Sequence, residues 1–150
     1  KRARLLDFVR QSNAIEGIIR PPTKSEIEAH QTLLALTSLT TVDVERFVRV
    51  VADAALRERI GMGVRVGSYF PPPGGPEIRH RLDNLLVTVN EGDSSPWDAH
   101  IAYETLHPFM DGNGRSGRAL WLWMMGGDRA VLPPLLFLHA FYYQTLRESR

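Results

Sequence analysis

Twelve consecutive residues, 107–118, carry side chains that could do chemistry on a phosphate, and they read HPFMDGNGRSGR. Histidine serves as a general base near neutral pH because its ordinary pKa is about 6.5. Arginine forks bind phosphate oxygens in pairs, and aspartate supplies the hard oxygen ligand that Mg²⁺ uses beside phosphates. We therefore predict a nucleotide site. His107 would be its base and Asp111 its metal ligand, and Arg115 and Arg118 would contact phosphates.

Two predicted helices must position this stretch. The first covers 95–106, with Ser95 as its N-cap, and the second covers 115–125. Glycines at 112, 114 and 117 let the backbone turn tightly at the start of the second helix. Unpaired N–H groups and the positive end of the helix dipole attract an anion there, so we expect a polyphosphate at that position. The alternative is a glycine-rich connection whose arginines are only solvated.

Residues 107–118 resemble the Fic-domain signature, HxFx(D/E)GNGRxxR, at every defined position. The resemblance implies an all-α fold, a Fic-type helical bundle with a small β-hairpin flap, as one domain over residues 1–150. It also implies a protein adenylyltransferase, with ATP as the substrate and Mg²⁺ or Mn²⁺ as the cofactor. Such an enzyme moves AMP to a Ser, Thr or Tyr hydroxyl of a target protein.

The resemblance assigns a role to each functional residue of the signature. His107 takes the proton of the target hydroxyl, and Asp111 holds the metal ion. The nucleotide is bound by five residues: Gly112, Asn113, Gly114, Arg115 and Arg118. The Doc-type branch, whose members transfer a terminal phosphoryl group, has lysine at the position of Gly114. Glycine there favours adenylylation over kinase chemistry.

A predicted helix over residues 3–16 ends in a second motif. Its apolar stripe continues into Ser12 and Glu16, and a carboxylate on an inward-facing stripe needs a cation because burying it unpaired is costly. Residues 12–17 resemble the inhibitory motif (S/T)xxxE(G/N) of Fic proteins. The resemblance implies that Glu16 pairs with Arg118 and obstructs the ATP γ-phosphate, while Ser12 steadies the helix. The alternative is a solvated glutamate at a helix end.

The rest of the chain predicts core helices and one strand-like stretch. Apolar spacing, caps and helix-ending glycines predict further helices at 23–36, 42–60, 76–91 and 134–148, which makes seven in all. Residues 61–70 have strand-like alternation before a proline-rich run that can continue neither a helix nor a ladder. Five residues resemble the second half of the Fic flap, which binds a target segment by strand addition: Val66, Gly67, Ser68, Tyr69 and Phe70. The alternative is a plain surface turn.

The composition narrows the functional classes. The 150 residues carry 18 basic and 17 acidic side chains without a basic run, which argues against nucleic acid as a partner. No apolar run approaches the roughly twenty residues of a membrane span. Cysteine is absent, which excludes disulfides. We expect a soluble, cytoplasmic protein, and because the sequence starts at Lys1 we expect its native start to have been trimmed.

Two alternatives to AMP transfer stay open. Some Fic domains use the inhibitory-type glutamate to position water and remove AMP from a modified protein, and the presence of both Glu16 and His107 permits that reaction. A non-catalytic module could instead use the flap groove to hold a peptide. A homo-oligomer also remains open.

Overall fold

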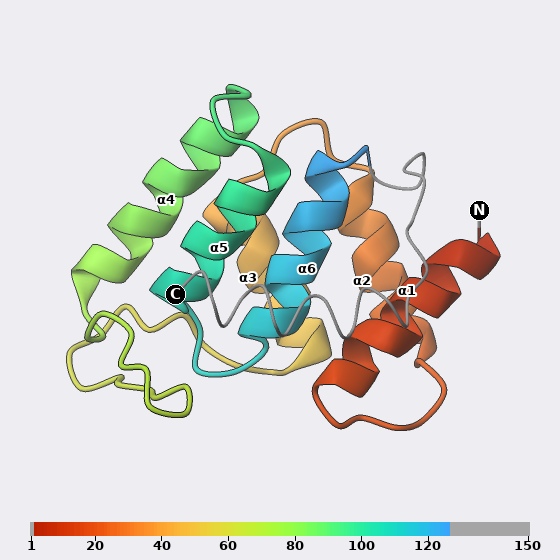
Figure 1. The fold of residues 1–150 in the computed structure, drawn as a ribbon, viewed down its shortest axis with the longest axis horizontal. Helices are drawn as coiled ribbons and strands as arrows, with labels where there is room; N and C mark the ends of the chain where they lie inside the picture. Colours follow the sequence, from red (N-terminus) through yellow and green to blue (C-terminus); the bar gives the residue numbers. More distant parts are fainter. Residues whose placement is uncertain (1, 127–150) are drawn as a thin grey trace.

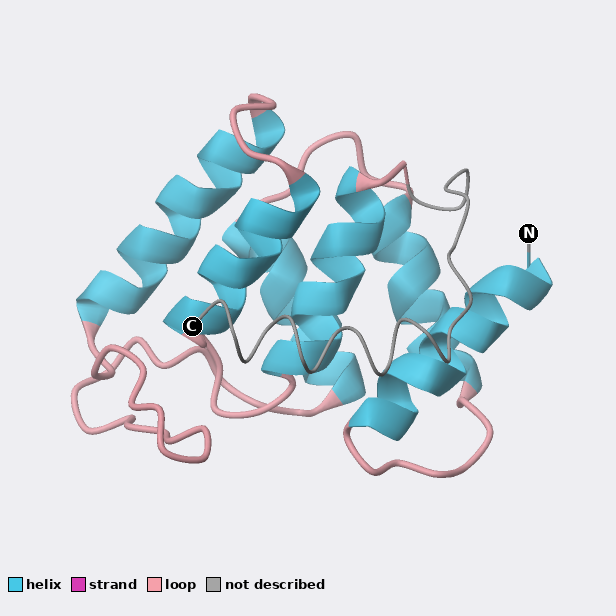
Figure 2. Cartoon of the chain, viewed as in Figure 1, coloured by secondary structure: helices cyan, strands magenta, loops and turns pink. Residues whose placement is uncertain are grey.

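The computed structural model describes residues 2–126, which fold into a bundle of six α-helices (Figure 1). In chain order they are α1 (Arg2–Ile15), α2 (Lys24–Leu34), α3 (Thr41–Val51), α4 (Pro76–Asn90), α5 (Pro96–Leu106) and α6 (Asn113–Met124). Figure 2 shows that loops join the helices and that the described residues contain no β-strand. The predicted all-α class is confirmed, whereas the predicted helix at 134–148 lies outside the described residues. Within residues 2–126, no helix is both long and apolar enough to cross a membrane.

Local sequence signals set several helix ends. Thr23 and Thr40 open α2 and α3 with capping boxes, in which the threonine hydroxyl and an acidic side chain bond each other's backbone N–H groups. Ser95 opens α5, its hydroxyl accepting from the Asp98 N–H at 3.1 Å. α1 ends two residues before Gly17, close to the predicted end. These bonds satisfy helix ends without help from distant parts of the chain.

α5 and α6 lie side by side in the middle of the bundle (Figure 1), and a glycine allows their close approach. A Cβ at Gly117 would overlap a carboxylate oxygen of Glu104 and lie 3.1 Å from the Tyr103 ring. Tyr103 is fully buried, and its hydroxyl bonds the Ser116 hydroxyl at 2.6 Å. The connection between α5 and α6 is therefore held at each end by a tightly packed helix.

A small apolar cluster seats α1 on the bundle. Leu5 and Phe8 of α1 are buried with Leu122 of α6. The His30 ring of α2 lies between two aromatic rings, with centroid distances of 6.3 Å to Phe8 and 4.7 Å to Phe47. Burial lowers the pKa of His30 to about 4, so its imidazole is neutral at pH 7. This packing brings the C-terminal end of α1 to the start of α6.

The predicted helix at 42–60 is wrong in its second half, because α3 ends at Val51. Asp53 takes a left-handed φ of 49°, and the chain then turns under the α5–α6 connection. There the Arg57 N–H donates to the Pro108 carbonyl at 2.8 Å. Apolar spacing predicted a continuing helix, but this long-range pairing replaces the helical bonds.

Residues 61–75 form a loop instead of a pair of strands (Figure 2). Val66 and Tyr69 exchange two backbone bonds, each 2.9 Å long, across a two-residue turn at Gly67 and Ser68. Gly67 has a φ of +59°, which is the left-handed conformation that tight hairpin turns use. A single bridge is not a strand, so the predicted β-hairpin flap is not confirmed.

Candidate nucleotide site

His107 ends α5, and its backbone turns the chain away from that helix. It is the C-cap residue, with φ 51° and ψ 62°, a left-handed conformation that residues with a Cβ rarely adopt. Its N–H donates to the Tyr103 carbonyl at 2.9 Å, and its carbonyl accepts from the Arg57 Nε at 2.7 Å. The turn is thus fixed from both sides, and the half-buried His107 stands at the start of the connection to α6.

Asn113 closes the connection into a tight loop. Its side-chain oxygen accepts from the Phe109 N–H and its side-chain nitrogen donates to the Phe109 carbonyl, both at 2.8 Å. Phe109 is fully buried and anchors the loop in the core. The amide group of Asn113 is therefore engaged by the loop backbone, and its contribution in this structure is the shape of the loop.

No side chain caps the backbone N–H groups in the first turn of α6. Its N-cap is Gly112, with a φ of +79° and no side chain to bond the first N–H groups. A Cβ at Gly112 would lie 2.8 Å from the Ala52 Cβ, so the loop passes close against the segment after α3. Uncapped N–H groups together with the helix dipole make this end of α6 suited to an anion.

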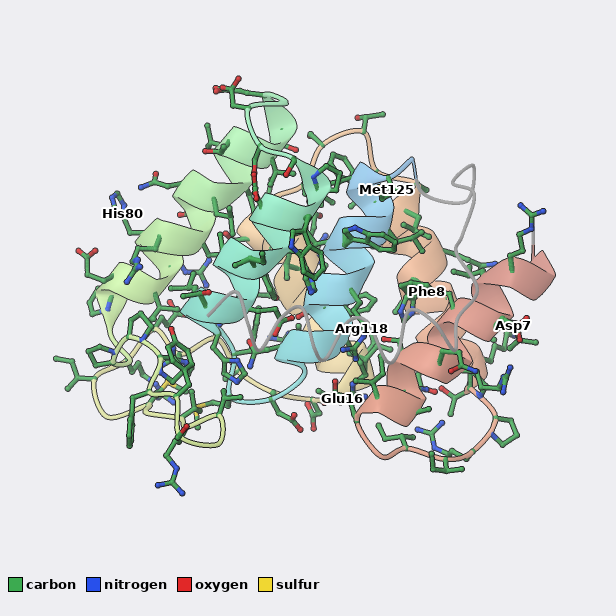
Figure 3. All side chains as sticks on the ribbon, viewed as in Figure 1. Asp7, Phe8, Glu16, His80, Arg118 and Met125 are labelled. Atoms are coloured by element: carbon green, nitrogen blue, oxygen red, sulfur yellow. The ribbon has the colours of Figure 1, made fainter. Side chains whose placement is uncertain are left out.

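Arg118, one turn into α6, is bound by the end of α1. Its Nη2 donates to the Glu16 carboxylate at 2.7 Å and to the Ser12 carbonyl at 2.9 Å, and its Nε donates to the Ser12 hydroxyl at 2.9 Å. Figure 3 shows the Glu16 and Arg118 side chains meeting where the C-terminal end of α1 crosses the start of α6. The Arg118 side chain is 4% exposed and that of Glu16 is 37% exposed, so the pair is shielded on the arginine side only.

Gly114 lies directly under this ion pair. A Cβ at position 114 would overlap a carboxylate oxygen of Glu16 and lie 3.0 Å from the Arg118 Nη1. Any side chain at position 114 would therefore compete with Glu16 for its place.

Arg115 is bound by the end of α3 in this structure. Its side chain is buried, and its Nη1 donates to the Val51 carbonyl at the end of α3. In this structure Arg115 thus ties α6 to α3. A phosphate contact from Arg115 would need this bond to open.

Asp111 stands at the exposed lip of the loop. One carboxylate oxygen accepts from the Gly112 N–H at 2.7 Å, and a carboxylate can accept further bonds. Within residues 2–126 no cluster of three or more ionisable metal ligands surrounds it. The donor set fits Mg²⁺ or Mn²⁺ held by one carboxylate, with the remaining ligands supplied by phosphate oxygens and water.

The five flap residues lie in the loop before α4, and one of them reaches the site. The Tyr69 hydroxyl donates to the Thr105 carbonyl at 2.7 Å, two residues before His107. Phe70 is 70% exposed, and the Arg65 guanidinium lies 5.9 Å above its ring centroid. The structure therefore brings the turn at 66–69 to the end of α5.

Arg57 is a structural residue of the site that the sequence patterns did not mark. It is fully buried, and its guanidinium bonds four backbone carbonyls, those of Met62, Pro72, Leu106 and His107. The predicted helix at 42–60 gave it no special role, because its partners lie up to fifty residues away. Only the tertiary fold reveals it.

The segment after Arg57 is held by a second cation. Arg79 of α4 bonds Glu58 at 3.1 Å and Glu45 of α3 at 2.9 Å. The hydrogen bond from Arg79 lowers the pKa of Glu58 below its usual range. The chain between α3 and α4 is thus fixed to both helices before it enters the flap turn.

Comparison with known proteins gives the fold and the family of the chain. A variant of Fic-1 from C. elegans, a fragment described as residues 134–508 with a glutamate-to-glycine substitution, has a similar structure with a TM-score of 0.67 and 22% sequence identity. The similarity covers 99% of this chain and 56% of that chain, so this chain spans just over half of its length. That likeness shows a shared fold. The model of the Fic/DOC family matches residues 26–125, from the first turn of α2 to the end of α6. The chain belongs to the Fic/DOC family.

Proposed function

We propose that the chain is a protein adenylyltransferase that moves AMP from ATP to a hydroxyl side chain of a target protein. The arrangement around the first turn of α6 carries the proposal. An uncapped helix start, a carboxylate at Asp111 and a guanidinium at Arg118 stand together, with His107 at the beginning of the same loop. These groups suit a nucleotide's phosphates on one side and an incoming hydroxyl on the other.

The reaction would proceed by attack of the target hydroxyl on the α-phosphorus of ATP. His107 would take the hydroxyl proton as the new phosphorus–oxygen bond forms. The bond from the α-phosphorus to the oxygen shared with the β-phosphate would break, and pyrophosphate would leave. Asp111 would hold Mg²⁺ or Mn²⁺, which supplies charge neutralisation of the phosphates when it is bound. Asn113 and Gly114 would offer their backbone N–H groups to the phosphates, and Gly112 would do so once Asp111 releases its N–H.

Gly114 supports AMP transfer over transfer of a terminal phosphoryl group. The Doc-type branch has lysine at this position. Here a side chain at 114 would overlap the Glu16 carboxylate. A chain that keeps Glu16 in this place therefore requires glycine at 114, and that glycine goes with the nucleotide orientation that exposes the α-phosphate.

The same contact supports autoinhibition as part of the proposed function. Arg118 would have to release Glu16 before it could bind the ATP γ-phosphate. A charge-assisted hydrogen bond contributes about 1.5–3 kcal/mol when it is shielded, and partial exposure of Glu16 places this pair at the lower end. Since about 1.4 kcal/mol is a factor of ten, the restraint would be roughly tenfold.

Removal of AMP from a modified protein is the second candidate, and one observation favours it. Glu16 binds Arg118 through a single carboxylate oxygen and its side chain remains 37% exposed. That carboxylate could therefore also hold a water molecule.

Cytoplasmic localisation and a homo-oligomeric state stay proposals as well.

ATP labelled at either its α- or its γ-phosphate separates these functions. The test uses the Glu16→Gly variant with Mg²⁺ and a cell lysate as the source of acceptor proteins. AMP transfer puts α-label, and no γ-label, into a protein band. Release of AMP from a pre-labelled band by the parent chain, lost in Glu16→Gly, would instead support AMP removal. If neither AMP transfer nor AMP release is observed, a non-catalytic binding module would be the better description.

A further inference from the structure

We propose that Arg57 is a positioning residue that keeps the flap loop, residues 62–72, in register with His107. The inference rests on the proposed function, because it concerns how the segment beside the target hydroxyl is held against the base. It is carried by the contacts of one buried guanidinium.

Arg57 joins two parts of the site that are far apart in sequence. Its Nε and Nη2 donate to the carbonyls of His107 at 2.7 Å and Leu106 at 2.9 Å. Its Nη1 donates to the carbonyls of Met62 at 3.1 Å and Pro72 at 2.9 Å. One side chain thus binds the last residues of α5 and both ends of the flap loop.

The geometry of the arginine side chain allows it to bridge the end of α5 and the flap loop. The carbonyls at the end of a helix have no partner within the helix, so Leu106 needs a donor from outside. A guanidinium presents five donors in a planar fork, whereas the ammonium of lysine is a compact point charge with three. Lysine at position 57 would keep the charge and lose the bridge between the two segments.

The burial of Arg57 makes its charge depend on these hydrogen bonds. The Arg57 side chain is 0% exposed, and among the described residues no carboxylate forms an ion pair with it. A buried charge without a carboxylate depends on its hydrogen bonds, so the four carbonyls hold Arg57 and are held by it. The left-handed backbone of His107 is fixed by one of those bonds.

Tyr69 supplies a second, uncharged tie between the same two segments. Its hydroxyl donates to the Thr105 carbonyl at 2.7 Å, in the last turn of α5. Tyr69→Phe would remove this bond without disturbing a buried charge. It therefore tests the same coupling in a variant that keeps the aromatic ring at position 69.

The experiment compares Arg57→Lys and Tyr69→Phe, each in the Glu16→Gly background, with Arg59→Lys as a matched control. Arg59 lies two residues away and is exposed. Two quantities are measured: hydrogen exchange along the chain by mass spectrometry, and transfer of α-label from ATP to lysate proteins across a range of ATP concentrations.

Arg57→Lys should speed hydrogen exchange in 62–72 and 105–110 together while α2 and α4 exchange as in the parent. The rate at saturating ATP should fall roughly tenfold to a hundredfold, because a small misplacement of a reacting group has effects of that size. KM for ATP should stay at the parent value, Tyr69→Phe should show a smaller fall, and Arg59→Lys should show none.

A parallel loss of ATP affinity, faster exchange throughout the bundle, or an unchanged rate would overturn the positioning role. Absence of α-label transfer in Glu16→Gly itself would count against the proposed function instead. In that case the exchange measurement decides on Arg57 alone. Faster exchange in both segments, 62–72 and 105–110, would support the positioning role of Arg57. Exchange that is unchanged, or that rises in only one of the two segments, would refute it.

Discussion

At the scale of single residues, the signature side chains divide into those that shape the loop and those that stand at its surface. Asn113 binds both backbone groups of Phe109, and Arg115 binds the end of α3. His107 and Asp111 flank the loop, while Arg118 is held by α1. The proposed chemistry therefore depends on residues whose positions are set by their neighbours.

The residue types and spacing of the signature predicted a nucleotide site in this loop from the sequence alone, but they could not predict the residues that support the loop. Arg57 and the Val51 carbonyl come from a segment that apolar spacing predicted as helix. Their bonds to the loop join residues about fifty and sixty-four positions apart. Local patterns carry no information about such partners, so the support of His107 had to come from the fold.

We predict that His107→Ala abolishes transfer of α-label and leaves ATP binding intact. The base acts on the target hydroxyl and not on the phosphates, and removing a general base slows a reaction by about 10²–10⁴-fold. Rates of α-label transfer in the Glu16→Gly background, with ATP affinity from calorimetry, check the prediction. A variant that still transfers label at the parent rate would exclude His107 as the base.

At the scale of helices, the site depends on how closely α5 and α6 approach. The capping residues and glycines of the sequence predicted these helices nearly to their ends. The fate of residues 52–60 could not be predicted in that way, because a long-range backbone pairing there replaces the helix. The flap was predicted as a hairpin, yet only the bridge between Val66 and Tyr69 forms.

The α5–α6 contact leads to a prediction about stability. Gly117→Ala would push a Cβ into the buried Glu104 carboxylate and the Tyr103 ring. Overpacking of this kind costs about 1–3 kcal/mol. Urea unfolding followed by circular dichroism should therefore show a lower midpoint. Gly63→Ala is the matched control, since a Cβ there meets nothing within 4 Å, and equal effects at both positions would contradict the packing argument.

The burial of His30 of α2 between Phe8 of α1 and Phe47 of α3 should make stability depend on pH. The pKa of His30 is lowered by burial to about 4, so the unfolded chain binds a proton at higher pH than the folded chain. The stability that the neutral His30 contributes is complete above the unfolded pKa of about 6.5 and is lost as the pH falls through about 4, with a total of about 3 kcal/mol.

His30→Gln should flatten this part of the pH profile in urea unfolding, because glutamine does not titrate and can still donate to the Glu26 carbonyl that the imidazole contacts at 2.7 Å. His80→Gln is the control. His80 is exposed on α4, and Figure 3 shows it far from α1. An unchanged slope in His30→Gln would mean that other groups cause the acid sensitivity.

At the scale of the whole molecule, the first and the last described helices meet at the site. α1 supplies Ser12 and Glu16, α6 supplies Arg118, and these bonds join residues more than 100 positions apart. The inhibitory motif predicted this partner, and the structure places the two side chains in contact. α1 is seated by a small apolar cluster that is separate from the main core of the bundle.

The central claim is tested most directly by the rate at which α-label moves from Mg²⁺-ATP to protein. This rate is compared among the parent chain, Glu16→Gly and Glu16→Gly/Arg118→Ala. We predict that Glu16→Gly raises the rate roughly tenfold, because the ion pair no longer has to break before Arg118 takes the γ-phosphate. The double variant should lose that gain, because it lacks the phosphate ligand. An unchanged rate in Glu16→Gly, or incorporation of γ-label in place of α-label, would contradict an adenylyltransferase restrained by its own first helix.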